Sequence, residues 1–240
     1  MKRQQFQLIG FLTVISLLVS SCWFLGPSVK GNGNVTKETR EVGEFDEIKV
    51  SRGMNVYITQ GTPASVVVIA DNNLHEIIQT EVRGHELRIY ADENIRWAKE
   101  KKVLVTVEKL SGVGTSSGSN AWSQGQITTE NLELKSSSGA NLTMEVDAKY
   151  LKADCSSGAN IILSGLAKEA ELESSSGASL NGEELKADYC RMRASSGGNV
   201  SSTVTEKLEA HASSGGNVFY SGEPASTEIN SSSGGNIIRK

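Results

Sequence analysis

Apolar and polar residues alternate through the second half of the chain, and a recurring Ser-Ser-Gly triplet interrupts the alternation. Successive glycines of the triplet are separated by 21, 19, 19, 20, 18 and 19 residues. Seven copies at one spacing indicate a solenoid, in which each repeat forms one coil. The glycines are Gly118, Gly139, Gly158, Gly177, Gly197, Gly215 and Gly234.

The residues that flank each glycine predict strands. The fifth residue before the glycine and the third after it are mostly aliphatic, and the third before it is small or short, as in Leu134, Ser136 and Leu142 around Gly139. Polar residues mostly fill the alternate positions, which is the period of a strand. Helical solenoid repeats need about 33 residues or more, so about 19 residues favour strands. We therefore expect an all-β fold in which residues 113–240 form a regular parallel β-solenoid, similar to a right-handed β-helix.

Asparagine stands two residues after the glycine in six of the seven copies, and Ser179 replaces it once. We expect a turn with positive φ at the glycine and the asparagine, which tolerate that conformation best. Stacked asparagine side chains can also hydrogen-bond from coil to coil. Both residue types are thus interpreted as structural. The asparagines are Asn120, Asn141, Asn160, Asn199, Asn217 and Asn236.

Charged residues occupy the sixth position before the glycine. Their sign alternates through the first five members of the series Glu133, Lys152, Glu171, Arg191, Glu209 and Glu228. In a parallel stack such side chains lie above one another, where like charges repel. We expect this column to serve register and solubility, with exposed pairs contributing about 0.2–1 kcal/mol each.

Residues 44–112 continue the strand pattern less regularly. The repeat frame returns around Gly53, with Ile48 and Val50 before it and Asn55 and Val56 after it. Further strands are expected at Val66 and Val68, at Leu87 and Ile89, and from Val103 to Val107. The stretch Asp71–Thr80 has helical spacing and a possible capping box at Asn73 and Glu76, which predicts a short helix. The region forms either large irregular initial coils or a separate β cap, since a solenoid needs its end covered.

The first 22 residues predict export. Lys2 and Arg3 precede an interrupted apolar stretch, Phe6 to Val19, which suits a signal peptide better than a membrane span. The stretch ends in Val19-Ser20-Ser21-Cys22, which resembles a bacterial lipobox whose cysteine is acylated. We expect residues 1–21 to be a lipoprotein signal peptide, Cys22 the lipidated residue and 22–43 a tether rich in turn-forming residues. A plain secretory signal with a chance cysteine, or a transmembrane anchor, are the alternatives.

The charge balance and the cysteine content agree with export from the cytoplasm. The chain has 24 basic and 28 acidic residues, and cleavage before Cys22 would remove two of the basic ones. An acidic balance argues against a nucleic-acid partner, which needs a basic face. Cys155 and Cys190 invite a disulfide, but the coil alignment separates them by about 10 Å along the stack and about 13 Å along the strand, too far for a bond. We expect both to be reduced core residues.

Catalytic and metal-binding patterns are weak. Gly114-Thr115-Ser116-Ser117-Gly118 matches G-x-S-x-G, but that motif requires a strand-to-helix turn, and here it is the first copy of the repeat. His75, His85 and His211 share no ligand spacing, and the turns lack the aspartate of calcium-binding nonapeptides. We expect no catalytic residue, metal or cofactor.

Two groups of residues leave other functions open. Arg191 and Arg193 lie one coil above Glu171 and Glu173, which is the nearest approach to the charged groove of a β-helix polysaccharide lyase. Tyr150 and Tyr189, each eight residues before a glycine, could stack on sugar rings or cover a groove between coils. Three acids in one groove would favour an enzyme, whereas a flat face of serine and asparagine would favour binding.

Four segments carry a resemblance to a known family. The run Phe45–Val50, the turn Gly53–Val56, the stretch Asp71–Leu74 and the serial Ser-Ser-Gly-x-Asn repeats resemble the head GIN domain family of putative auto-transporter adhesins. The resemblance covers Phe45 to Ile237. It implies a bacterial protein outside the cytoplasm, commonly a lipoprotein of Bacteroidetes, with a parallel β-helix-like fold. It brings no established activity and no catalytic residues.

These observations predict a non-catalytic lipoprotein of the cell envelope, most readily of the outer membrane. It would bind glycan, protein or envelope components and contact the membrane through its N-terminal lipid. A β-helix carbohydrate-active enzyme, of polysaccharide lyase or hydrolase type, is the alternative. The last strand, Asn236–Ile238, would expose an unpaired edge, guarded only by Arg239 and Lys240, and so permit edge-to-edge association.

Overall fold

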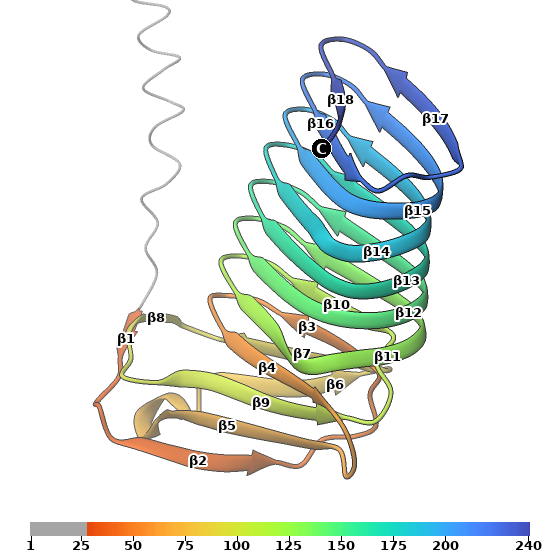
Figure 1. Ribbon diagram of the computed structural model, residues 1–240. Coiled ribbons are helices and arrows are strands. Elements are labelled where there is room, and N and C mark those ends of the chain that lie inside the picture. The colour runs from red at the N-terminus through yellow and green to blue at the C-terminus, as the bar shows by residue number, and fades with distance from the viewer. Residues whose placement is uncertain (1–27) are drawn as a thin grey trace, which may run out of the picture.

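Stacked parallel strands build the second half of the protein, as the Ser-Ser-Gly repeat predicts (Figure 1). In the computed structural model, which describes residues 28–240, each long strand pairs in parallel with the strand one coil later. The all-β solenoid is therefore confirmed. The long strands are β11 (Asn120–Ser136), β12 (Asn141–Cys155), β13 (Asn160–Ser174), β14 (Ser179–Ala194) and β15 (Asn199–Ala212). The first regular coil opens with β10 (Gly112–Thr115), and the last ones contain β16 (Asn217–Ser221), β17 (Ser226–Ser231) and β18 (Asn236–Arg239).

Each long strand covers two faces of the solenoid, because it bends around the edge opposite the Ser-Ser-Gly turns (Figure 1). The half after a turn presents the asparagines outward, and we call this side the Asn face. The half before the next turn presents the charged column outward, and we call this side the charged face. Between the two faces, aliphatic residues stack in register, such as Leu142 on Ile161 and Leu134 on Ala153. The buried core is one continuous cluster from Ile48 to Val218.

The Ser-Ser-Gly turn differs from the prediction at one residue. Positive φ falls on the second serine and the glycine, 54° at Ser157 and 68° at Gly158, and not on the asparagine. The N–H of Ala159 donates to the carbonyl of Ser156 at 3.2 Å, which closes a turn of the type I′ form. The N–H of Gly158 donates to the carbonyl of Ser176 in the next coil at 3.2 Å. The left-handed pair thus joins neighbouring turns, and the asparagine begins the following strand.

The asparagine ladder is confirmed. Each asparagine donates from Nδ2 to Oδ1 of its equivalent one coil earlier, as from Asn141 to Asn120 at 2.7 Å and from Asn160 to Asn141 at 3.0 Å. The ladder starts at Asn55, which accepts from Asn120 at 2.9 Å. It is interrupted where Ser179 faces Asn160 and Asn199.

The N-terminal region continues both faces of the solenoid. As the frame around Gly53 predicts, Ile48 and Val50 pair with the β10 strand, and Asn55 and Val56 pair with β11. Beyond these parallel pairs, β2 and β6 close the two faces as antiparallel edge strands. The region is thus a set of initial coils that shares the core of the solenoid and covers its first end. Its strands are β2 (Val35–Arg40), β3 (Glu47–Val50), β4 (Asn55–Gln60), β5 (Ser65–Asp71), β6 (Ile78–Arg83), β7 (Glu86–Ala91) and β9 (Lys101–Val107).

The helix predicted over Asp71–Thr80 was wrong. A single 3₁₀ turn, η2 (Asn72–Leu74), precedes β6. The side chain of Asn73 does not cap a helix, because it accepts from the N–H of Asn32 and donates to the carbonyl of Lys30, both at 3.0 Å. Leu74 and Ile78 are both buried, so the apolar spacing reflects a turn followed by a strand.

Part of the predicted tether, 22–43, is also ordered. Strand β1 (Ser28–Lys30) pairs in parallel with β8 (Asn94–Trp97), and the whole of β2 pairs with β5. Most of β2 is exposed, so it carries no apolar period that the sequence could show. The predicted signal peptide and Cys22 lie outside the described residues.

The far end of the solenoid is open among the described residues. There, β17 pairs only with β15, and β18 only with β16. The N-terminal region lies at the opposite end (Figure 1) and does not fold back over these strands. Arg239 pairs with Glu223 at 2.9 Å and Lys240 pairs with Glu183, so both charges are held by side chains of the solenoid wall.

Candidate binding site

Outward side chains of the charged face form a grid. Pairing places Tyr150, Glu169 and Tyr189 in one column, as residues of successive coils. The next column along the strands is the predicted charge column, and its register is confirmed from Glu133 to Glu228. Along each strand, every second side chain points outward, which sets the distance between columns. Between strands, the stacking of coils sets the distance between side chains of one column, roughly 5 Å per coil. The grid is therefore fixed by the backbone.

Ion pairs tie the columns together. Arg191 contacts Glu209 at 2.9 Å and approaches Glu171 at 3.9 Å, so it bridges the coils below and above its own. Arg193 contacts Glu173 at 2.7 Å and Glu171 at 3.5 Å. The sequence comparison of these two arginines with Glu171 and Glu173 therefore placed the four side chains together correctly.

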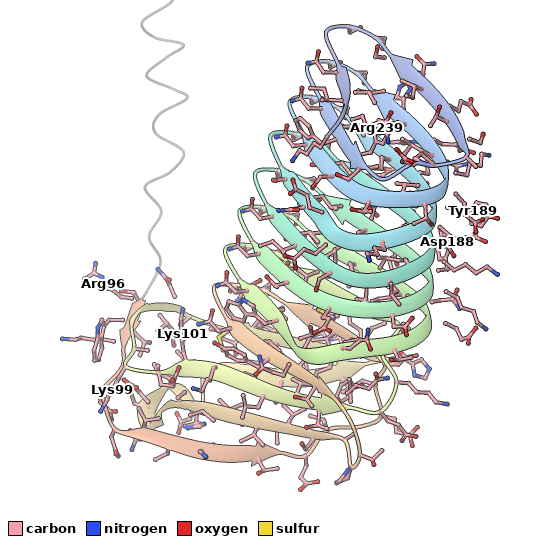
Figure 2. All side chains as sticks on the ribbon, viewed as in Figure 1. Arg96, Lys99, Lys101, Asp188, Tyr189 and Arg239 are labelled. Atoms are coloured by element: carbon pink, nitrogen blue, oxygen red, sulfur yellow. The ribbon has the colours of Figure 1, made fainter. Side chains whose placement is uncertain are left out.

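A hollow of about 310 Å³ opens on this grid between β12 and β15. We call it the tyrosine pocket. Tyr150 and Tyr189 lie two coils apart on its rim, 37% and 41% exposed, with Glu169 between them. Figure 2 shows Tyr189 and its neighbour Asp188 projecting from the edge of the solenoid. The remaining polar lining includes Glu171, Arg191, Lys207 and Glu209.

The protonation states in the pocket follow from its contacts. Hydrogen bonds from Lys207 and Arg191 lower the pKa of Glu209. Burial and a hydrogen bond to Glu171, 3.1 Å from its hydroxyl, raise the pKa of Tyr150. Near neutral pH the pocket thus presents the ionised carboxylate of Glu209, the cations that bind it and the protonated phenol of Tyr150, which together can donate and accept hydrogen bonds.

Three acids line the pocket, which is the arrangement that the sequence reasoning set as the mark of an enzyme. Glu171 and Glu209 are each held by an arginine or a lysine, so they are poorly suited to donate a proton. Glu169 faces the two tyrosines. The Asn face carries the asparagine ladder, but the outward column beside it contains Trp122 and Ile162, so it is not the flat face of serine and asparagine that would mark a binding protein.

A second and larger hollow of about 1000 Å³ runs along the bend of the long strands. We call it the edge groove. The repeat does not predict it, because its residues come from the bends, where register shifts interrupt the repeat frame. Lys109, Lys149, Lys168 and Lys186 line it with Asp147 and Asp188, while Leu166 is 50% exposed beside them. The recurrence of lysine near these bends was the available signal.

Other residues that the sequence singled out are dispersed. Cys155 and Cys190 are free and buried, as predicted. Ser116 lies in the turn between β10 and β11, two strands, so the G-x-S-x-G match forms no nucleophile elbow. His211 points outward from the charged face. No group of three metal-ligating side chains occurs among residues 28–240.

A membrane-spanning helix is not found in the described part of the chain.

Solved structures with the same fold come from Bacteroides and Parabacteroides species. A putative adhesin from Bacteroides fragilis superposes with a TM-score of 0.82 at 20% identity, covering 88% of this chain and all of that one. A putative adhesin from Parabacteroides merdae gives a TM-score of 0.72 at 16% identity, with 90% and 100% covered. A putative lipid binding protein from Parabacteroides distasonis gives 0.69 at 18% identity, with 89% and 100% covered. These likenesses establish the shared fold.

Sequence comparison identifies the family. No curated protein matches the chain. A family model described as "putative auto-transporter adhesin, head GIN domain" matches residues 44–224, which begin at the initial coils and end in the penultimate coil. The chain therefore belongs to the head GIN domain family of putative auto-transporter adhesins.

Proposed function

We propose that this protein is a lipid-anchored adhesin of the bacterial cell envelope whose tyrosine pocket binds a glycan. The observation that carries the proposal is the pair Tyr150 and Tyr189, two exposed rings on one column with charged hydrogen-bonding groups around them. Aromatic faces bind the apolar faces of sugar rings, and carboxylate and guanidinium groups bind hydroxyls. The membership of this chain in a family described as adhesins supports a binding role.

A glycan array probed with the mature chain carrying Cys22→Ala tests this proposal. We expect retention of a restricted set of glycans, and loss of most of the signal in Tyr150→Ala and Tyr189→Ala. Tyr189→Phe keeps the ring and should retain much of the signal. Ile162→Ala is the matched control, because Ile162 is 50% exposed on the Asn face. Equal binding by all variants would place the glycan elsewhere.

The glycans retained on the array also test the alternative that the protein is a carbohydrate-active enzyme. The carboxylates of the tyrosine pocket are the candidate catalytic groups for that alternative. Retained oligosaccharides incubated with the protein would be cleaved if Glu169, Glu171 and Glu209 act in catalysis. Mass spectrometry of the recovered glycans would then show shorter products, and Glu169→Gln would abolish them. For an adhesin we expect every glycan at its original mass.

The anchor is tested separately. The lipobox ending at Cys22 predicts diacyl or triacyl modification of that residue, and intact-mass analysis of the protein from its membrane fraction measures it directly. Cys22→Ala should leave the protein outside the membrane fraction. A mature N-terminus at any other residue would contradict the lipoprotein assignment.

A further inference from the structure

An exposed aromatic and basic surface lies where the described chain begins. Strand β8 ends at Trp97, which is 48% exposed, and the Nζ of Lys30 in β1 lies 5.8 Å from the centre of its ring. Arg96 and Lys99 flank the tryptophan along the chain and are exposed. Figure 2 shows Arg96 and Lys99 projecting from this side of the initial coils. We call the four residues Lys30, Arg96, Trp97 and Lys99 the tether flank.

The backbone under the tether flank is rigidly held. Ser28 and Val29 pair with Asn94 and Ile95, and the N–H of Gly31 donates to the carbonyl of Trp97 at 2.7 Å. Val29 and Ile95 pack against the core cluster. The tryptophan is thus presented on an ordered two-stranded sheet, although its ring is exposed.

The charge of the tether flank is unbalanced. Among residues 28–240, no side-chain nitrogen of Lys30, Arg96 or Lys99 lies within 4.0 Å of a carboxylate oxygen. The buried carboxylate of Asp71 accepts from the backbone N–H of Lys99 at 3.3 Å. Glu100, the acidic residue that follows Lys99, is paired with Lys102 at 2.9 Å. Asp92 and Glu93 lie at the other end of β8. A locally basic surface is notable because acids outnumber bases in the whole chain, 28 to 24.

The length of the segment before β1 restricts where this surface can lie. Six residue steps separate Cys22 from Ser28, and a fully extended chain spans at most about 3.6 Å per step, or about 22 Å. A lipid on Cys22 therefore keeps Ser28, two residues before Lys30 of the tether flank, within about 22 Å of the bilayer. Trp23 and Phe24, beside the lipidated cysteine, are residue types that favour the membrane interface and would shorten the distance further.

We propose that the tether flank is a membrane-contact surface, in which Trp97 enters the interface and Lys30, Arg96 and Lys99 meet anionic headgroups. The inference rests on the proposed lipidation of Cys22. A basic patch near an anionic bilayer adds to the membrane affinity that the acyl chains supply, and also orients the protein on the bilayer. Figure 2 places Tyr189 on the opposite side of the molecule from Arg96. Contact through the tether flank thus leaves the tyrosine pocket facing away from the bilayer.

Tryptophan fluorescence of the lipidated protein in vesicles tests the contact. In a Trp23→Phe, Trp122→Phe background, Trp97 is the single reporter. In vesicles containing phosphatidylglycerol we expect the emission of Trp97 to be blue-shifted relative to that of the lipid-free chain in buffer. We also expect lipids with brominated acyl chains to quench it. Lys30→Glu combined with Arg96→Glu should abolish both, and high salt should weaken them because exposed charges are screened.

Two controls make the result decisive. Lys168→Glu combined with Lys186→Glu makes the same charge change at the edge groove and should leave the quenching intact. Without the lipid, partition of the Cys22→Ala chain to the same vesicles should fall at least about tenfold in the Lys30→Glu, Arg96→Glu variant. Acylated protein in vesicles whose Trp97 emission matches that of the lipid-free chain in buffer without vesicles would overturn the contact while leaving the anchor in place. Absence of acylation would instead overturn the anchor, and with it the basis of this inference.

Discussion

A buried carboxylate fastens the first strands of the protein. Asp71 has no exposed surface, and its Oδ2 accepts from the N–H of Gly33 at 2.8 Å and of Lys99 at 3.3 Å, while Oδ1 accepts from Glu100 at 3.2 Å. A Cβ at Gly31 would lie 2.2 Å from Oδ2, so glycine there leaves room for the carboxylate. One side chain thus joins the start of the ordered chain to the segment that follows Trp97.

Asp71 should make stability depend on acidic pH. Burial acts to raise the pKa of Asp71, but the backbone hydrogen bonds and the charge of Lys99 together lower it below its usual 3.8. A carboxylate whose pKa is lower in the native protein than in the unfolded chain stabilises the fold. This stabilisation is complete above the pKa of the unfolded chain and is lost as pH falls through the native pKa. In urea unfolding, Asp71→Asn should therefore be less stable than wild type at pH 7, and the difference should shrink below about pH 4.

Asp154 provides the control of opposite sign. Burial, with repulsion from Glu173 and Glu133, raises its pKa despite Lys152 and Lys135. When the pKa of a carboxyl group is higher in the native protein than in the unfolded chain, the native protein loses stability as pH rises from the unfolded pKa to the native pKa. Asp154→Asn should be as stable as wild type, or more so, at pH 7. If both variants lost equal stability at every pH, titration would not be the cause.

The two core cysteines should be chemically inert in the native protein. Burial raises the pKa of Cys155 to about 11 and that of Cys190 to about 12. Only the thiolate is nucleophilic, so alkylation near neutral pH requires unfolding. In the Cys22→Ala chain we expect no reaction with an aromatic disulfide reagent until urea is added, and then two thiols. A linked Cys155–Cys190 peptide from native protein would contradict the observed coil register.

Among the elements, the asparagine ladder shows how a repeat carries information beyond its hydrophobic pattern. Each rung uses the amide donor of one coil and the amide acceptor of the coil before it. Ser179 breaks the series between Asn160 and Asn199. Asn160 there lacks a ladder donor to its Oδ1, and Asn199 lacks a ladder acceptor for its Nδ2, among the described residues.

Completing the ladder should stabilise the protein. Ser179→Asn supplies both missing groups at a position that already has the strand register of an asparagine. Two new side-chain bonds should add about 1–2 kcal/mol to the free energy of unfolding, measured as a higher urea midpoint. Asn141→Ser, which creates the same gap elsewhere, should lower the midpoint by a similar amount. A neutral or destabilising Ser179→Asn would show that the rungs are exposed contacts without net value.

How far the sequence predicts each element depends on whether its residues obey the repeat. The positions of Leu134 and Leu142 were predictable because burial demands an apolar side chain at the same position of each coil. The charge column was predictable because coil stacking aligns these exposed residues and disfavours like charges in neighbouring coils. Strand β2 was not, because an exposed edge strand is specified by the backbone of β5 and not by its own side chains. The tyrosine pocket was half predictable: Tyr150 and Tyr189 stood out at equivalent positions, but the hollow around them depends on the side chains of four coils.

For the whole molecule, the repeat makes stability nearly one-dimensional. Each coil contacts the coils before and after it, and the core runs through all of them. Stability of such proteins is a sum of coil and interface contributions. Exposure increases toward the open end, where every residue of β17 is exposed, so unfolding should begin there.

Removing one whole coil should leave a folded protein. Deletion of residues 159–177 joins Gly158 to Ala178 and places β12 against β14, with Leu142 beside Leu180 in the same interior column. At about 0.05–0.15 kcal/mol per residue, 19 residues account for about 1–3 kcal/mol of unfolding free energy. We expect an unchanged β-type circular dichroism spectrum per residue and one cooperative urea transition at a lower midpoint. Deletion of 159–174 is the matched control: it shifts β14 out of frame by three residues and directs its aliphatic side chains outward. That variant should lose the cooperative transition, and equal behaviour of the two deletions would show that coil register does not hold this fold together.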